Sequence, residues 1–380
     1  MSPLKANVLR LTLLMLFVAA AVTVFIDRTS AQNATTPGPT APSEKTVEQT
    51  HKNIQVLKGL PDSQLIPVMN YMAASLGVRC NYCHVNKEGK WDFPSDEIAE
   101  KKTAREMITM VGGINKNNFR GDPEVSCYTC HRGRTSVVHT LSVPLPTPEP
   151  RPSAAPSPTA SQQVNPTAEQ ILDKYYQAVG GAEAIDKLKS RVMKGTLITG
   201  QGAEIGYELN QSGPDSVLAV LTTPQGVFER ALTGPTGWEK SDRGLRDLTD
   251  FEINYIRRHS LLYADLRLKD EFSRVSFRGK QNIDGRDVYV VGATTTGGAR
   301  ETLFFEVETG LLVRRTSSTR TPVGSIPEQV DFADYKEVEG MKLPFTIRFS
   351  AVDPSYSGVR KFTEIKLNVP IDPKRFNKPA

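Results

Sequence analysis

Two five-residue segments share one spacing of cysteine and histidine. Residues 80–84 read Cys-Asn-Tyr-Cys-His, and residues 127–131 read Cys-Tyr-Thr-Cys-His. Two thiols separated by two residues can each add to one vinyl group of a porphyrin, and the histidine that follows can bind the iron. The pattern predicts two covalently bound haem c groups, held by the pairs Cys80 with Cys83 and Cys127 with Cys130. The predicted iron ligands are His84 and His131.

Other uses of paired cysteines explain these segments less well. All four cysteines of the chain lie in them, and two of its five histidines follow directly. Disulfide bonds give no reason for a histidine after each pair. A zinc site made of the four thiols would have to close an unusually long loop. A thioredoxin-like redox pair is disfavoured because neither segment joins a strand to a helix in a βαβ unit.

The second axial ligand decides what each haem can do. Methionine opposite histidine closes the iron site and raises its reduction potential, whereas an open position allows ligand binding or catalysis. Met69 and Met72 precede the first segment, and Met107 and Met110 precede the second. A methionine on an apolar helix face also serves as core packing, so the residues alone do not choose within each pair.

Other residues could also contact the haems. The remaining histidines are weaker ligand candidates, because a solvated surface imidazole explains them equally well; they are His51, His139 and His259. Arg132 and Arg134 follow the second segment, and a guanidinium could pair with a haem propionate.

The elements around these segments are predicted to be helices and loops. Apolar residues recur at helical spacing over residues 60–76 and 96–114, and each of these stretches precedes a cysteine segment. Residues 87–94 and 115–123 are rich in Gly, Asn, Asp and Pro, which predicts loops. A helical region this small has a modest core, so a bound haem would supply much of its stability.

Composition divides the rest of the chain. Residues 1–31 combine Lys5 and Arg10 with an apolar run over 11–26 and small residues up to Ala31, which predicts a signal peptide or an uncleaved membrane anchor and export to the periplasm. Residues 32–43 are predicted to be disordered, 44–140 to form a diheme cytochrome c domain, and the Pro-rich stretch 141–166 to be a linker.

Residues 167–380 predict a second domain of a different class. A helix is expected over 167–189, followed by alternating strands joined by short turns at 284–285, 309–310 and 339–340. Consecutive hairpins of this kind indicate a curved antiparallel sheet around a helix. The predicted fold class is therefore multidomain, with a small α-helical diheme domain and an α+β half-barrel domain.

The charge of the chain excludes one class of partner. The 380 residues carry a formal charge of +5, and residues 1–31 hold three basic side chains against one acidic, so their removal leaves about +3. Haem propionates would make the cytochrome region more negative. A nucleic-acid partner is therefore not expected.

Two sequence segments of the first domain resemble those of a known protein family. Ile66-Pro67-Val68-Met69 leading to Cys80 and His84, and Ala104-Arg105-Glu106-Met107 leading to Cys127 and His131-Arg132-Gly133, resemble the cytochrome c subunit of photosynthetic reaction centres. The resemblance covers about residues 45–140. It implies that a helix before each haem carries the distal methionine, which places these ligands on Met69 and Met107.

The departures from that family limit what the resemblance implies. Its photosynthetic members carry four haems, one of them ligated by a histidine between the second helix and its motif, and residues 115–126 contain no histidine. This chain corresponds to one two-haem half. The resemblance therefore favours a diheme carrier that serves redox partners of another exported electron-transfer chain.

The second domain resembles the half-barrel of envelope lipoprotein carriers. The similar residues include Asp334-Tyr335, Gly340 to Phe345 and the stretch Phe362 to Pro370. Such folds hold acyl chains, but a fold does not establish a function. The leading hypothesis is electron transfer with histidine and methionine axial ligands. Its alternatives are a haem enzyme with one open distal site and an envelope lipid- or partner-binding protein with a redox module. No nucleophile–base pair is seen in residues 167–380, so an electron carrier is favoured over an enzyme.

Overall fold

The computed structural model describes residues 44–137, 165–353 and 356–379. Lys45–Ala380 form one compact unit, whose described parts are a helical part and a sheet part. The predicted signal peptide or anchor, the segment 32–43, nearly all of the linker and His139 lie outside the described residues. Those expectations, and the division of the chain into two domains, stay predictions.

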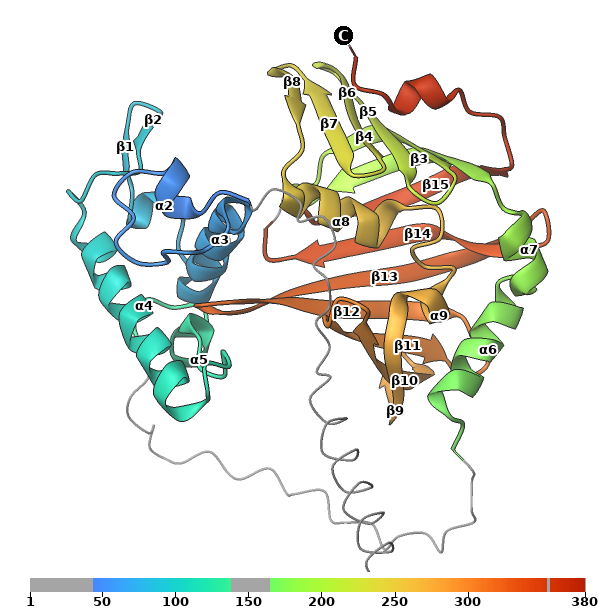
Figure 1. Cartoon of the computed structure of the whole chain (residues 1–380), viewed down its shortest axis with the longest axis horizontal. Helices are drawn as coiled ribbons and strands as arrows, with labels where there is room; N and C mark the ends of the chain where they lie inside the picture. Colours follow the sequence, from blue (N-terminus) through green and yellow to red (C-terminus); the bar gives the residue numbers. More distant parts are fainter. Residues whose placement is uncertain (1–43, 138–164, 354–355, 380) are drawn as a thin grey trace, which may run out of the picture. The chain divides into compact units, whose positions relative to one another are not determined.

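The helical part contains short and long helices around the two cysteine segments (Figure 1). Its elements are α2 Val47–Thr50, η1 Asp62–Gln64, α3 Leu65–Leu76, η2 Cys80–Tyr82, α4 Ala99–Asn118 and α5 Cys127–His131. Helix α3 lies within the predicted range 60–76. Helix α4 continues to Asn118, so the loop expected over 115–123 begins later than predicted.

The loop predicted over 87–94 is instead largely a β-hairpin. Strand β1, Val85–Lys87, pairs with β2, Lys90–Asp92. The turn residues Glu88 and Gly89 have φ angles of 53° and 82°. Two residues with positive φ match the right-handed twist of the flanking strands. The prediction missed the hairpin because its strands are short and mostly polar.

A buried cluster holds the helical part together. It contains Val47, Leu60, Val68 and Tyr71, and Met69 and Met72 pack against it. Within the same compact unit, Val323 and Ile326, beside the β12–β13 turn of the sheet, belong to this cluster too. The methionine-bearing face of α3 is therefore directed inward.

The sheet part is a single antiparallel sheet in the order β8-β7-β6-β5-β4-β3-β15-β14-β13-β12-β11-β10-β9. Its strands are β3 Ser190–Thr199, β4 Glu204–Ser212, β5 Ser216–Thr223, β6 Gly226–Thr233, β7 Thr236–Ser241, β8 Gly244–Asp247, β9 Phe272–Ile283, β10 Arg286–Thr295, β11 Arg300–Glu306, β12 Leu312–Thr321, β13 Gly324–Val338, β14 Met341–Ala351 and β15 Gly358–Leu367. All neighbours pair in sequence order except β3 and β15, the first and last strands, which lie side by side. The prediction of a large antiparallel sheet is confirmed.

The expected hairpins have the turn chemistry that the sequence indicated. Asp284 and Gly285 connect β9 to β10, and Glu339 and Gly340 connect β13 to β14, all four with positive φ. Strands β11 and β12 pair across the turn at 309–310. These short connections make neighbours of strands that are adjacent in the chain.

Helices cover one face of the sheet (Figure 1). They are α6 Ala168–Ala178, α7 Gly181–Lys187, α8 Asp250–Ser260 and α9 Leu268–Glu271, and a short η4, Pro373–Phe376, follows the last strand. Side chains of α6, α8 and α9 share one buried core with the strands. The single helix predicted over 167–189 is two helices, because Gly180 has a φ of 124° and interrupts the turn. Within the described ranges, no helix is long and apolar enough to cross a membrane.

Candidate haem-attachment site

The first cysteine segment forms a tight turn at the surface. Cys80 opens η2, and the backbone N–H of His84 donates to the carbonyl oxygen of Cys80 at 3.0 Å. Cys80 is exposed, whereas Cys83 and His84 are half-buried. One turn of chain therefore presents two thiols and an imidazole together, as attachment to a porphyrin requires.

The second segment is the short helix α5, which has its own cap. Ser126 Oγ accepts from the backbone N–H of Thr129, and Thr129 Oγ1 accepts from the backbone N–H of Ser126 at 3.0 Å. This reciprocal pair is a capping box. The helix ends at Arg132, which has a φ of 49°. Cys127 and Cys130 thus lie one helical turn apart, with His131 directly after them.

The two imidazoles suit iron binding. His131 Nδ1–H donates to the carbonyl oxygen of Arg134 at 3.0 Å, which leaves Nε2 to bind a metal. Burial, followed by the positive charge of Lys101, lowers the pKa of His84. The neutral imidazole, which is the ligating form, is therefore favoured at His84.

One thiol of each segment, Cys83 and Cys127, has electrostatics unlike those of a redox-active thiol. Burial raises the pKa of Cys83, and Glu100 raises it further. Burial also raises the pKa of Cys127. Redox-active thiols have lowered pKa values, so the raised values at these two thiols do not favour a redox role for either.

The candidate distal methionines lie on the two long helices of this part. Met69 and Met72 are half-buried on α3, and Met107 is half-buried on α4. Met110 is 46 % exposed. Cys127 packs against the same buried cluster as Met69 and Met72. The choice of Met69 over Met72 and of Met107 over Met110 stays a prediction.

Apolar side chains gather at the surface of the helical part. Of ten exposed large hydrophobic residues in the described chain, eight belong to it: Ile66, Tyr82, Trp91, Phe93, Met110, Phe119, Tyr128 and Val137. Tyr82 and Tyr128 lie inside the two cysteine segments. So many exposed apolar groups in so small a region mark a surface that another apolar group covers. Covalently held porphyrins would do this, so the residues present fit two haems.

The other predicted residues have different surroundings. His51 is exposed and contacts Asp62 at 2.7 Å. His259 is buried in the sheet part, 3.7 Å from Glu328, and burial lowers its pKa. Arg132 and Arg134 are exposed. In residues 44–137, 165–353 and 356–379, no group of three His, Cys, Asp or Glu side chains is arranged to hold a metal ion.

Sequence reasoning missed three residues beside His84. Phe93 meets the His84 ring edge to face at 5.2 Å, and Trp91 stacks on Phe93. Lys101 Nζ donates to the backbone carbonyl of Phe93 at 2.7 Å. The alternation of Trp91 and Phe93 after the Glu88-Gly89 turn was the available signal for a hairpin.

The sheet part contains a buried charge network on its core face. Arg315, with a side chain 1 % exposed, pairs with Glu301 at 2.5 Å, Glu271 at 2.5 Å and Asp265 at 3.4 Å. Burial raises the pKa of Asp265 and of Glu271. A face interrupted by fixed charges does not suit an acyl chain, because each charge must keep its partners.

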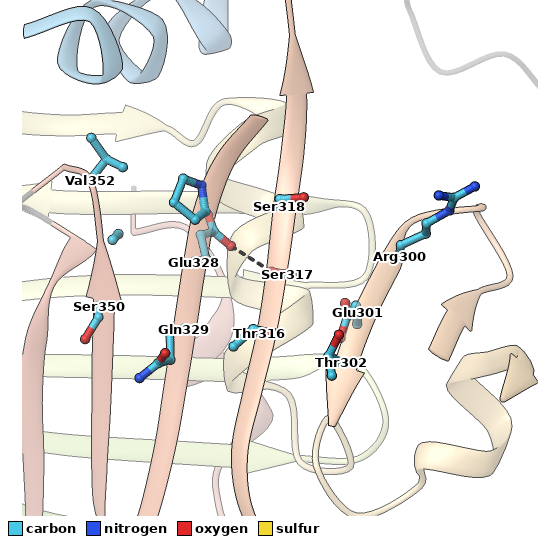
Figure 2. Close-up of a pocket in the computed structure, with 12 residues that line it drawn as sticks. Arg300, Glu301, Thr302, Thr316, Ser317, Ser318, Glu328, Gln329, Ser350 and Val352 are labelled. Carbon is cyan, nitrogen blue, oxygen red and sulfur yellow. Dashed lines mark hydrogen bonds between the residues drawn. The ribbon is translucent and has the colours of Figure 1, made fainter. Parts of the chain in front are cut away.

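The opposite face of the same strands carries an open hollow of about 640 Å³. Figure 2 shows Thr302, Thr316, Gln329 and Ser350 in a row across β11 to β14, which the strand register confirms. Their neighbours Glu301 and Glu328 alternate with them along the strands, so they point to the core face. The outward row offers hydrogen bonds from neutral groups and no carboxylate pair for acid–base catalysis.

Comparisons with known proteins agree with the resemblance of the first domain. Residues 18–175 match the family model of the photosynthetic reaction centre cytochrome C subunit. The chain is 36 % identical over 98 residues to such a subunit from Roseobacter denitrificans, covering 24 % of this chain and 26 % of that protein. It is 38 % identical over 87 residues to cytochrome c-554 of Chloroflexus aurantiacus, covering 21 % and 20 %. The matches span about a quarter or less of each relative's length.

Solved structures resemble the sheet part more distantly. A DUF1329 family protein from Desulfovibrio piger has a TM-score of 0.42 at 13 % identity, covering 55 % of this chain and 96 % of its own. A LolA superfamily protein from Nitrosomonas europaea has a TM-score of 0.39 at 15 % identity, covering 56 % and 99 %. The fold assignment rests on the strand pairing described above.

Proposed function

We propose that this protein is an exported diheme c-type cytochrome that transfers electrons between redox partner proteins, with no catalytic site of its own. The observation that carries the proposal is the pair of Cys-x-x-Cys-His segments, each presented on one turn within a surface rich in apolar side chains. Its similarity to reaction-centre and c-type cytochromes supports the same chemistry.

Each residue of the site has one role in this proposal. The thiols of Cys80, Cys83, Cys127 and Cys130 hold the two porphyrins, and His84 and His131 bind iron. Met69 and Met107 complete the axial ligands and keep other molecules from the iron. Haem c, when bound, supplies a one-electron couple whose potential depends on its axial ligands and its exposure to water. The surrounding chain excludes water and orients the imidazoles.

The sheet part has a supporting role in the proposal. Its core face is filled by apolar side chains and by the network around Arg315, which leaves little room for an acyl chain. Docking of a partner protein is the role proposed for it. Localisation in the periplasm, with or without an N-terminal membrane anchor, follows from the sequence of residues 1–31 and belongs to the proposal.

The direct test is a count of covalent haem in protein produced with a c-type maturation system. The wild type should retain two haems per chain after denaturation. Replacing Cys80 and Cys83 with Ala should leave one haem, as should replacing Cys127 and Cys130. Wild-type protein without covalent haem would disprove the proposal. Two haems with a substantial high-spin fraction would instead support a haem enzyme with an open iron site.

A further inference from the structure

The β1–β2 hairpin after the first cysteine segment places the rings of Trp91 and Phe93 on the same face as His84, the predicted iron ligand. Val85 pairs with Asp92, so the flanking residues His84 and Phe93 face each other across the base of the hairpin. Their ring centroids are 5.2 Å apart with an interplanar angle of 74°. Trp91 lies two residues before Phe93 and therefore on the same face. The two rings stack at 5.4 Å with an interplanar angle of 2°.

This aromatic pair is exposed although the hairpin itself is anchored. Val85, on the other side of the hairpin, is 7 % exposed, whereas Trp91 is 43 % and Phe93 is 52 % exposed. Large aromatic rings left this open indicate a surface that a further group covers. Because the pair stands beside the His84 imidazole, a porphyrin bound to that imidazole would adjoin it.

Helix α4 fastens the end of the hairpin. Lys101 Nζ donates to the backbone carbonyls of Phe93, Pro94 and Ser95 at 2.7, 3.0 and 2.7 Å. The same Nζ lies 3.2 Å from Asp96 Oδ1, and the Lys101 side chain is only 11 % exposed. The backbone of Phe93 is thereby tied to the helix that also carries Met107.

We propose that Phe93 is a positioning residue for the iron ligand His84, held in place by Lys101 and by the stacked ring of Trp91, and that this hairpin closes the first haem site from water. The inference rests on the proposed function. The ring of Phe93 restricts rotation of the imidazole, much as the carbonyl of Arg134 holds His131 through its Nδ1 hydrogen bond. Contacts to a metal-binding side chain from the residues around it fix the orientation of that side chain and limit the access of water to the metal.

The expected consequence is a change in one haem only. Water near a haem stabilises the more highly charged ferric state, so opening the site should lower the reduction potential of the first haem. In Phe93→Leu we expect the equilibrium constant for its reduction to fall about tenfold, which is about 59 mV for a one-electron couple. The potential of the second haem should not change.

The test is an optical redox titration of holoprotein variants whose two covalent haems are first verified. The step missing from the protein with Ala at Cys80 and Cys83 identifies the first haem. Lys101→Met should shift that same step, because it releases the backbone of Phe93 and also removes a positive charge near His84. Trp91→Leu changes no charge and should shift the same step through the position of Phe93 alone. Lys102→Met, at the exposed neighbouring position, is the matched control and should shift neither step. Phe93→Tyr keeps an aromatic ring at this position and should therefore keep the wild-type reduction potential of the first haem.

The possible outcomes test the role of Phe93 and the diheme assignment separately. Shifts confined to the first step in both Phe93→Leu and Trp91→Leu would support the role of Phe93. Unchanged potentials in Phe93→Leu, or equal shifts of both steps, would overturn it while leaving the diheme assignment intact. If Phe93→Leu fails to fold, Trp91→Leu gives the same readout without a change of charge. A wild type without two covalent haems would instead count against the proposed function.

Discussion

The carbonyl oxygen of Gly133 lies only 2.2 Å from the point where a side chain on Gly77 would begin. Gly77 ends helix α3 with a φ of 67°, and Gly133 follows the second cysteine segment. The backbone N–H of Gly133 donates to the carbonyl of Ser75 at 2.8 Å. The end of the helix before the first segment is therefore joined, backbone to backbone, to the turn after the second.

This contact predicts that Gly77→Ala destabilises the helical part strongly. The methyl group would clash with backbone that cannot move aside, and φ is also unfavourable for alanine, so we expect a loss of about 3 kcal/mol in the free energy of unfolding. Gly89→Ala is a matched control, because Gly89 has a φ of 82° and nothing within 4 Å of its added methyl. That variant should lose about 1 kcal/mol. Equal urea midpoints for the two variants would show that the close approach does not matter.

The ligand assignment predicts different effects for neighbouring methionines. Met69→Ala and Met107→Ala should each remove half of the methionine–iron charge-transfer absorbance of the oxidised protein, and the double variant should remove all of it. Met72→Leu and Met110→Leu should keep the full band. Loss of the band in Met72→Leu would move the first ligand from Met69 to Met72.

A carboxylate at the start of α8 predicts a pH dependence of stability. Arg246 donates to Glu252 at 2.7 and 2.9 Å, and the backbone N–H of Thr249 donates at 2.9 Å. Burial alone would raise the pKa of Glu252, but these hydrogen bonds and the charge of Arg246 lower it to about 2. A folded pKa below the ordinary value of 4.5 stabilises the fold above about pH 4.5.

That stabilisation is lost as the pH falls towards 2. Glu252→Gln should therefore reduce the free energy of unfolding by about 2 kcal/mol at pH 7, and the difference from the wild type should shrink steadily below pH 4.5. Urea titrations across this range provide the measurement, with Glu204→Gln at an exposed position as control. A difference that is independent of pH would contradict the assignment.

The buried network predicts unequal effects for two adjacent arginines. Arg315→Met leaves Glu301, Glu271 and Asp265 without their shared cation, so the free energy of unfolding should fall by about 3–5 kcal/mol. Arg314 pairs with Asp331 and is 25 % exposed on the other face of the same strand. Arg314→Met should lose about 1 kcal/mol or less. Similar denaturant midpoints for the two variants would be inconsistent with a buried role for Arg315.

By itself the sequence determined the features that depend on residues close in the chain. The Cys-x-x-Cys-His segments specify their chemistry within five residues, and the hairpins of the sheet follow from two-residue turns such as Asp284-Gly285. Helix α3 followed from the spacing of its apolar residues, although it begins at Leu65 and not at residue 60, because Pro61 and the 3₁₀ helix η1 precede it. Local hydrogen bonds and turn geometry are sufficient for such elements.

Only the tertiary structure decided which distant residues meet. It brought the first strand β3 beside the last strand β15, the turn at Gly133 against Gly77, and carboxylates from three separate segments around Arg315. It also placed Phe93 on His84 through a hairpin whose polar strands gave little periodic signal. These contacts depend on packing and burial between segments remote in the chain, which no local pattern of residue types encodes.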